Sequence, residues 1–278
     1  MSNLSQVQRQ EGYPALGSRV IGRVNWLGLY TLYSRETRRF IKVWAQTLAA
    51  PAVTTILFMV IFTLALGGRG RMVADMPYAQ FLAPGLMVMA MLQNAFANTS
   101  SSLLISKVQG NIVDTLMPPL SATELTLGYV AGGVTRGLAV GASVGLAFMF
   151  MPDVDLGPAN VWAVIYFALT ACVMLSLLGV LTGVWAEKFD HAAAITNFVI
   201  APLSLLSGTF YSISRLSENW QAFSKANPFF YMIDGFRYGL IGVADSDLMT
   251  GVVYTFAINL VLAIVVYRVF KTGYRLKA

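Results

Sequence analysis

Long apolar stretches separated by short polar segments constrain the fold of this chain more than any other feature. One membrane-spanning helix needs ~20 predominantly apolar residues, and the chain offers about six stretches near that length. A water-soluble domain carries about 25% charged residues, whereas this chain carries 12% and is 56% hydrophobic. We therefore expect an all-α integral membrane protein with six transmembrane helices. The predicted spans are Ala45 to Leu66, Phe81 to Ile105, Leu125 to Met151, Val161 to Ala186, Ala192 to Ser207 and Leu248 to Phe270.

The distribution of Lys and Arg predicts the orientation of these spans, because short cytoplasmic loops carry an excess of both residues. With the N-terminus inside, thirteen fall on the cytoplasmic side and five on the outer side. The cytoplasmic set is Arg9, Arg19, Arg23, Arg35, Arg38, Arg39, Lys42, Lys107, Lys188, Arg268, Lys271, Arg275 and Lys277, and the outer set is Arg69, Arg71, Arg215, Lys225 and Arg237. The sequence thus predicts a multi-pass membrane protein with both termini in the cytoplasm. The net charge of +6 follows from this bias, and the absence of a basic patch with interleaved aromatics indicates no nucleic-acid partner.

Residues 1 to 44 form a polar, basic segment ahead of the first span. Aromatic residues such as Trp26 and Tyr30 alternate there with basic residues such as Arg35. This mixture is typical of an amphipathic helix in the headgroup region, where aromatics sit at the interface and cations meet anionic lipid. We therefore divide the chain into a cytoplasmic segment, 1–44, with an amphipathic interface helix that contacts membrane lipid, and a six-span domain, 45–278.

The sequence lacks the residue sets that catalysis or metal binding requires. It contains no glycine-rich phosphate loop, since the nearest string, Lys271 to Gly273, has no glycine cradle. The spans hold no nucleophile with a base and no paired acids, so we predict no catalytic residues. Cys172 and His191 are each the only residue of their type, and this is too few ligands for a metal site.

The spans also lack the acids that ion-driven transport uses as a relay. All thirteen carboxylates fall at span ends or in loops. The sequence therefore favours a passive conduit that a partner protein drives. Two alternatives stay open: a non-transporting membrane scaffold or receptor, which explains the spans and loops equally well, and an ion-coupled carrier.

The cytoplasmic segment between spans two and three is too long for a simple turn. Val108, Ile112 and Leu116 recur on one helical face before Pro118 and Pro119 end the helix. A short helix with exposed apolar side chains there is suited to docking in a groove on a cytoplasmic protein. The alternative is a loop helix that rests on the membrane.

The segment between spans five and six mixes aromatic and charged residues over 208–247. Asn227 followed by Pro228 predicts an N-cap and first helical turn. Asp234 and Arg237 are three residues apart and can pair on one helix face. Such a pair sits at membrane depth only where protein or water surrounds it, so the segment is either re-entrant or a folded periplasmic loop.

Span three carries four glycines at a spacing of four, from Gly133 to Gly145. Small residues at this spacing let helix backbones approach closely, and we expect them to pack within the chain. Arg136 lies beside this stripe, where a charge in lipid is costly. We expect Arg136 to face protein or to snorkel to the cytoplasmic side, with Glu187 and Asp190 as its partners.

Polar residues in spans two and five are candidates for a transport pathway. An amphipathic cargo needs a few hydrogen-bonding groups on an otherwise apolar wall. The alternative is that the same side chains only join helices, at about 0.6 kcal/mol each. The candidates are Asn94, Asn98 and Ser101 in span two and Asn197, Ala201 and Ser204 in span five.

From about Trp26 onward the sequence resembles the ABC-2 type exporter permeases, in particular the YadH-like bacterial inner-membrane branch. The most specific matching stretches are Tyr78 to Leu86, Asn111 to Leu120 with Leu127 to Gly133, and Asn227 to Gly239. The resemblance implies a six-span half-transporter that forms a homodimer and binds two copies of a separate cytoplasmic ABC ATPase. It further implies export of an amphipathic or lipid-like molecule. ATP and Mg would bind on the partner, so this chain would hold no cofactor.

The resemblance also implies roles for the three candidate segments. The segment matching the family's coupling helix contains Lys107, Val108, Ile112, Asp114 and Leu116. The outer segment with Asn227, Pro228, Asp234 and Arg237 would form short re-entrant helices that gate the path. Spans two and five would lie at the dimer midline, which favours the pathway interpretation of their polar residues.

Overall fold

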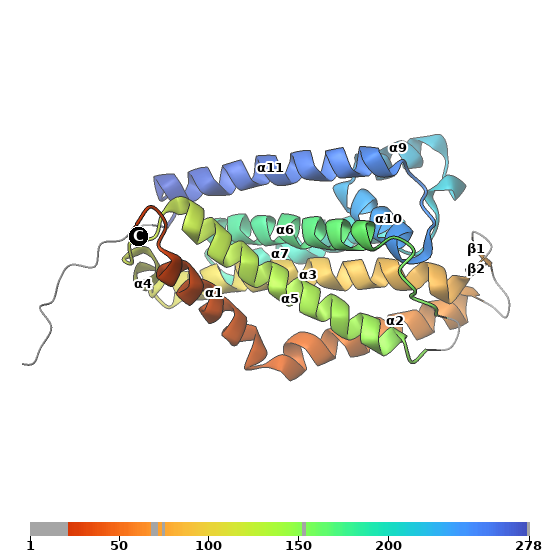
Figure 1. The fold of residues 1–278 in the computed structure, drawn as a ribbon, viewed down its shortest axis with the longest axis horizontal. Helices are drawn as coiled ribbons and strands as arrows, with labels where there is room; N and C mark the ends of the chain where they lie inside the picture. The colour runs from red at the N-terminus through yellow and green to blue at the C-terminus, as the bar shows by residue number, and fades with distance from the viewer. Residues whose placement is uncertain (1–21, 68–71, 74–75, 152–153, 277–278) are drawn as a thin grey trace, which may run out of the picture.

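The computed structural model describes residues 22–67, 72–73, 76–151 and 154–276, and most of these residues are helical (Figure 1). Residues 1–21, with Arg9 and Arg19, lie outside the described part, as do Arg69, Arg71 and Lys277. The predicted segment 1–44 is therefore described only from residue 22. Five described helices are long and apolar enough to cross a membrane. The first is Ala45–Ala65, and α2 (Ala50–Phe62) lies within it. The other four are α3 (Tyr78–Val108), α5 (Ala122–Phe148), α6 (Val161–Trp185) and α11 (Leu248–Thr272).

These five helices coincide with predicted spans one, two, three, four and six, so the predicted helices of membrane-crossing length are present at these five places. The fifth predicted span is helical but shorter. It consists of α7 (Phe189–Ile195), a π-helical turn (Thr196–Ile200) and α8 (Ala201–Leu205). Together they extend about 26 Å, a little less than the ~30 Å hydrocarbon core, so a sixth crossing stays a prediction.

Shorter elements gather at the two ends of the bundle (Figure 1). One end holds α4 (Ile112–Leu116) and the start of α1 (Trp26–Ile41). The opposite end holds a small antiparallel pair, in which Met72 of β1 (Met72–Val73) lies opposite Pro77 of β2 (Met76–Pro77). That end also holds a 3-10 turn (Ile213–Arg215), α9 (Glu218–Ala226) and α10 (Pro228–Ile241).

The core of the bundle is α3 packed against α6, and glycines on α6 set their spacing. A Cβ added at Gly179 would lie 2.6 Å from the carbonyl oxygen of Phe96, and one at Gly183 would lie 3.0 Å from that of Ser100. The hydroxyl of Thr99 donates a hydrogen bond of 2.9 Å to the carbonyl oxygen of Ser176 across the same contact. The absent side chains therefore allow the close backbone approach that stabilises helix pairs in membranes.

The glycine stripe of α5 packs within the chain, as predicted. A Cβ at Gly133 would contact Thr99 of α3, and one at Gly137 would lie 2.6 Å from the sulfur of Cys172 on α6. A Cβ at Gly141 would lie 2.6 Å from the sulfur of Met91.

Side chains that cap helices fix where α1, α5 and α11 begin. Ser121 and Glu124 form a capping box at the start of α5. Glu124 also accepts a hydrogen bond of 2.5 Å from the backbone N–H of Asn25, the N-cap of α1, so the two helices start together. Asp247 caps α11 by accepting from the backbone N–H of Thr250 at 2.8 Å, and this bond lowers the pKa of the Asp247 carboxyl.

Candidate functional site

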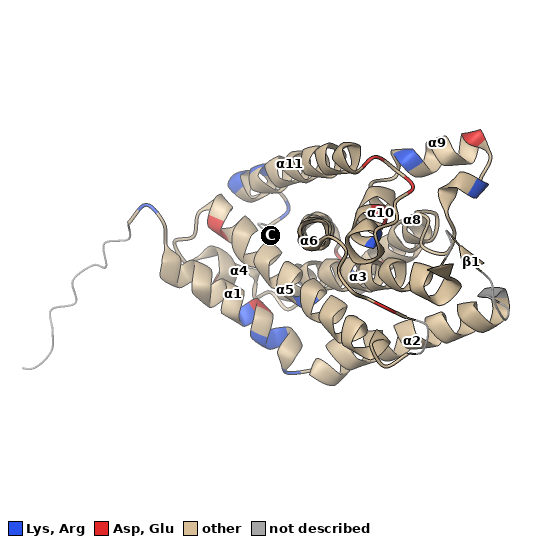
Figure 2. Cartoon of the chain, turned by 45° about the vertical axis from the view of Figure 1, so that its right-hand side comes forward, with Lys and Arg blue, Asp and Glu red and all other residues tan. Residues whose placement is uncertain are grey.

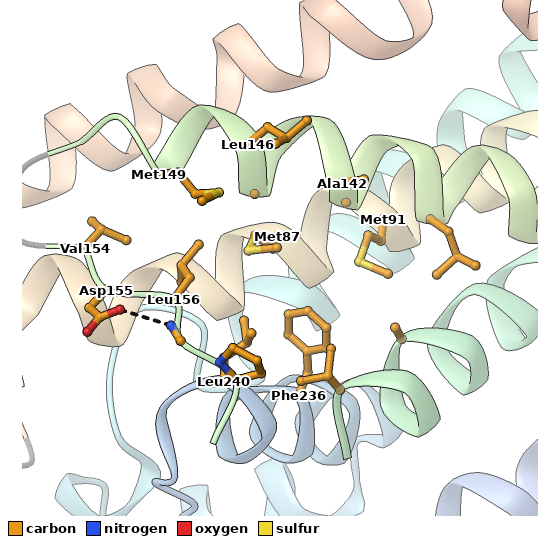
Figure 3. A pocket seen from close by; sticks show the side chains of 17 residues that line it. Met87, Met91, Ala142, Leu146, Met149, Val154, Asp155, Leu156, Phe236 and Leu240 are labelled. Atoms are coloured by element: carbon orange, nitrogen blue, oxygen red, sulfur yellow. Dashed lines mark hydrogen bonds between the residues drawn. The ribbon is translucent and has the colours of Figure 1, made fainter. Parts of the chain in front are cut away.

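A cavity of about 850 Å³ lies among α3, α5, α6 and α10 (Figure 3). Met87 and Met91 of α3 and Ala142 and Leu146 of α5 line one part of it, and Phe236 of α10 lines another (Figure 3). Asp155 is the one charged residue in its lining, and it lies in the segment between α5 and α6. The cavity therefore suits an apolar ligand or an apolar part of a larger one.

Glycines and methionines together shape this cavity. Gly141 and Gly145 of α5 line it without a side chain, and the thioethers of Met91 and Met87 lie beside them. Methionine side chains are flexible and adapt to irregular partners. From the sequence, the glycine stripe was predicted only as a packing surface, because the cavity also depends on how α10 approaches α5.

The six predicted pathway residues do not line this cavity, and two of them are fully buried. Asn98 is fully buried on α3, and its side-chain oxygen accepts a hydrogen bond of 3.2 Å from Nη2 of Arg39 on α1. Ser204 is also fully buried and donates to the carbonyl oxygen of Ile200 at 2.7 Å. Of the others, Asn197 is exposed, whereas Asn94, Ser101 and Ala201 are half-buried. Their role in transport stays a prediction.

Arg136 finds its partner on α3, and the predicted partners Glu187 and Asp190 are wrong. Nη2 of Arg136 donates a hydrogen bond of 2.9 Å to the side-chain oxygen of Asn94. The reason is that Arg136 and the two carboxylates lie at different positions along the length of the bundle. Arg136 lies about 21 Å from the start of α5, whereas both carboxylates follow the end of α6 at Trp185.

A buried carboxylate, Glu36, joins α1 to the bundle. It is fully buried and accepts hydrogen bonds from Nη2 of Arg35 at 3.1 Å and from the hydroxyl of Ser102 at 2.8 Å. Nη2 of Arg39 lies 3.4 Å from its second oxygen. Glu36 was not among the residues predicted from the sequence, although the spacing of four between Leu32, Glu36 and Phe40 places all three on the buried face of α1.

Two arginines of α1 extend these contacts to neighbouring elements. Arg39 donates to the carbonyl oxygen of Asn98 at 2.5 Å and to the hydroxyl of Ser101 at 3.0 Å. Arg35 donates to the hydroxyls of Thr115 at 3.0 Å and of Tyr129 at 3.2 Å. The amphipathic helix predicted in 1–44 is therefore present as α1, and it is held by α3, the α4 turn and α5.

The predicted docking segment is helical, but its exposed face differs from the prediction. Ile112 is 7% exposed and Leu116 is half-buried, and both pack in the bundle's core, so their predicted exposure is wrong. Val108, at the end of α3, is exposed, and Val113 and Met117 are the exposed apolar residues of the α4 segment. A 3.6-residue period cannot say whether its apolar face meets the protein's own core or a partner.

The two charged residues of this segment also have different surroundings. Asp114 is exposed. Nζ of Lys107 donates to the carbonyl oxygens of Val184 at 2.6 Å and Ala186 at 2.8 Å, at the C-terminal end of α6. Cations favour this helix end, so Lys107 stabilises α6. The docking role of the segment as a whole stays a prediction.

Helix α10 has the predicted N-cap and the predicted ion pair. The side-chain oxygen of Asn227 accepts from the backbone N–H of Phe229 at 3.0 Å, and Pro228 is the first residue of α10. Nη1 of Arg237 lies 3.8 Å from a carboxylate oxygen of Asp234, and both side chains are 1% exposed. Both local predictions are confirmed, and protein surrounds the pair.

Two further sets of hydrogen bonds and one cation–π contact tie this pair to three other segments. Asp234 accepts from the backbone N–H groups of Asp245 and Ser246, each at 2.9 Å, in the loop that leads to α11. Nη2 of Arg237 donates to the carbonyl oxygen of Gly208 at 2.7 Å, just after α8. The Arg237 guanidinium also lies 4.0 Å from the ring centre of Phe81 on α3. The end of the bundle that holds α10 therefore has a buried polar junction.

Comparison with known proteins supports the resemblance noted in the sequence. Residues 28–241 match the ABC-2 type transporter family. The inner membrane transport permease YadH of Escherichia coli (strain K12) is 38% identical over 245 residues, which cover 87% of this chain and 92% of that protein. Nodulation protein J of Neorhizobium galegae is 23% identical over 232 residues, which cover 82% of this chain and 85% of that protein. This chain therefore belongs to the ABC-2 type transporter family.

Proposed function

We propose that the chain is the transmembrane permease subunit of an ATP-binding-cassette exporter. It moves an amphipathic or lipid-like molecule out of the cytoplasm or the inner leaflet, and a separate ATPase drives it. The observation that carries the proposal is the cavity of about 850 Å³, because its lining is apolar except for Asp155. Membership of the ABC-2 family supports the permease role.

The cargo class follows from the walls of this cavity. Burying a hydrocarbon chain in the cavity is favourable by about 0.8 kcal/mol for each CH₂ group. Three flexible methionines let the cavity wall adapt to the shape of that chain: Met87, Met91 and Met149. A long sugar polymer would instead need aromatic stacking along a wider channel. A compact amphiphile is therefore the favoured cargo.

The proposed ATPase binds at the end of the bundle that holds α4. Val113 and Met117 are 53% and 77% exposed there, next to exposed Asp114. We propose that this surface, together with Val108, docks in a groove of the ATPase. ATP and Mg then bind on that partner, two copies of which serve a homodimer of this chain. Basic residues at this end, visible on α1 and α11 in Figure 2, support its placement in the cytoplasm of a multi-pass inner-membrane protein.

We propose that α3 and the segment 189–205 lie at the midline of the dimer. Asn197 is exposed, and Asn94, Ser101 and Ala201 are half-buried, so these four remain available to line a path. Asn98 and Ser204 are buried and support the wall from behind. The helix pair α9 and α10 is the proposed outer gate, with Asn227 and Asp234 fixing its position.

A substitution that fills the cavity tests this proposal. Ala142→Phe places a ring in the cavity, and Ala139→Phe is the matched control because Ala139 lies on α5 but outside the lining. The readout is ATP hydrolysis by the complex with its ATPase in nanodiscs, stimulated by a single-chain lysophospholipid. A ring that excludes two CH₂ groups of the amphiphile from the cavity lowers the affinity of the protein for the amphiphile about tenfold. Equal stimulation of both variants and the parent protein would contradict the proposed role of the cavity.

A further inference from the structure

Two grooves on α1 meet at the side chain of Tyr30. The first, of about 500 Å³, runs between α1 and α5 and is lined by apolar and aromatic groups, among them Trp26, Tyr33 and Val134. The second, of about 660 Å³, runs along the polar face of α1. Its lining includes Arg35, Arg38, Arg39 and Lys42. Tyr30 lines both grooves, so an apolar surface and a basic surface are continuous on one helix.

The basic groove carries more positive charge than the protein neutralises. Four cations line it, and the carboxylate in contact with them is Glu36, which is fully buried and pairs with Arg35 and Arg39. Arg38 and Lys42 are exposed, and the side chain of neither has a hydrogen bond or an ion pair with a described residue. Figure 2 shows these cations along α1 and at the corner that leads to α2. The groove is therefore complementary to an anion.

The depth of the groove places it where lipid headgroups meet hydrocarbon. Helix α3 has 31 residues and is about 46 Å long, whereas the hydrocarbon core is ~30 Å thick. When α3 extends equally beyond both faces of the hydrocarbon core, about 8 Å of the helix lies outside the core at each end. Arg39 contacts Asn98 and Ser101, which lie about 10 to 15 Å from the end of α3 at Val108. Cations at this depth need an anion or protein partners.

We propose that these two grooves form one binding site for a phosphate-bearing anionic lipid of the adjacent leaflet. The phosphate binds between Arg38 and Lys42, with Arg35 beside them, since guanidinium groups match phosphate oxygens in geometry and charge. The hydrocarbon chain lies along Trp26 and Tyr33 in the apolar groove. This site does not rest on the export role, because a scaffold or a carrier with the same α1 would bind the same lipid.

The test compares lipids retained by the purified protein. The chain is purified from micelles that contain equal amounts of phosphatidylglycerol and phosphatidylcholine, and mass spectrometry counts both lipids. Each cation near an anionic lipid raises the binding constant for that lipid about fivefold. Two unpaired cations therefore give a ratio of bound phosphatidylglycerol to phosphatidylcholine of roughly 30. The variant R38Q/K42Q should bring the ratio close to one. The control R268Q/K271Q removes the same charge from α11, outside the groove, and should leave the ratio unchanged.

Two further arms separate the lipid from a free anion. Millimolar inorganic phosphate should not displace phosphatidylglycerol from the parent protein, because it lacks the hydrocarbon chain. Ala131→Phe fills the apolar groove, which Ala131 lines, and should lower retention of the lipid with the basic groove intact. Equal retention of both lipids by the parent protein, an equal loss in R268Q/K271Q, or displacement by inorganic phosphate would each overturn the proposal.

Discussion

The guanidinium of Arg237 lies over the ring of Phe81, 4.0 Å from its centre, and so joins helix α10 to α3. The contact is shielded from solvent, since both side chains are 1% exposed. A buried cation is costly unless it is paired and hydrogen-bonded. Asp234 and the carbonyl oxygen of Gly208 supply those partners. The position of the proposed outer gate therefore depends on one polar junction.

Removing the carboxylate of Asp234 should destabilise this junction strongly. Asp234→Ala leaves the Arg237 charge buried without its ion-pair partner, a change that typically costs about 3 to 5 kcal/mol. Asp247→Ala is the control, because it removes an exposed N-cap of α11 and costs about 1 kcal/mol. Chemical denaturation in detergent, followed by fluorescence, measures both. Equal losses of stability in the two variants would contradict the buried-junction account.

The approach of α3 to α6 should not tolerate a side chain at Gly179. In Gly179→Ala the new methyl group meets the carbonyl oxygen of Phe96, which is backbone and cannot rotate away. Such overpacking costs about 1 to 3 kcal/mol. Gly22→Ala is the control, since nothing lies within 4 Å of its added Cβ, and surface changes stay within about 0.5 kcal/mol. A Gly179→Ala protein as stable as Gly22→Ala would show that the helices are further apart.

Substitution of exposed apolar residues on the α4 segment should weaken binding of the ATPase. Met117→Asp and Val113→Asp should each lower the affinity about tenfold or more, as the loss of an interface anchor does. Met249→Asp is the control, because Met249 is 65% exposed at the start of α11, at the opposite end of the bundle. Co-purification with the ATPase and a titration of hydrolysis against ATPase concentration measure the effect. Unchanged association in both α4 variants would place the docking surface elsewhere.

The sequence predicted the elements of this fold better than the faces they present. Five membrane helices were predicted from apolar length, and the Asn227 cap and the Asp234–Arg237 pair from spacing. The predictions that Ile112 is exposed and that Arg136 pairs with Glu187 and Asp190 were wrong. In a soluble protein the apolar face of a helix points inward, but lipid and protein interior are equally apolar. Periodicity therefore does not identify which neighbour each face meets.

The cavity and the two grooves could not be predicted for a related reason. Each depends on distances between segments far apart in the sequence, such as Met91 with Gly141 or Tyr33 with Val134. The glycines that line the cavity were visible as a stripe. Their spacing indicates close packing equally well, and only the position of α10 and of the segment with Asp155 makes part of the stripe a cavity wall.

Movement of an amphiphile across a membrane tests the central claim most directly. The chain and its ATPase are reconstituted in vesicles with a fluorescent lysophospholipid, and movement between leaflets is followed by quenching from outside. We predict movement that requires ATP, persists when the proton gradient is collapsed, and falls in Ala142→Phe but not in Ala139→Phe. Movement that stops with the proton gradient while ATP is constant would identify an ion-coupled carrier. No ATP-dependent movement in the presence of an active, bound ATPase would contradict the exporter account.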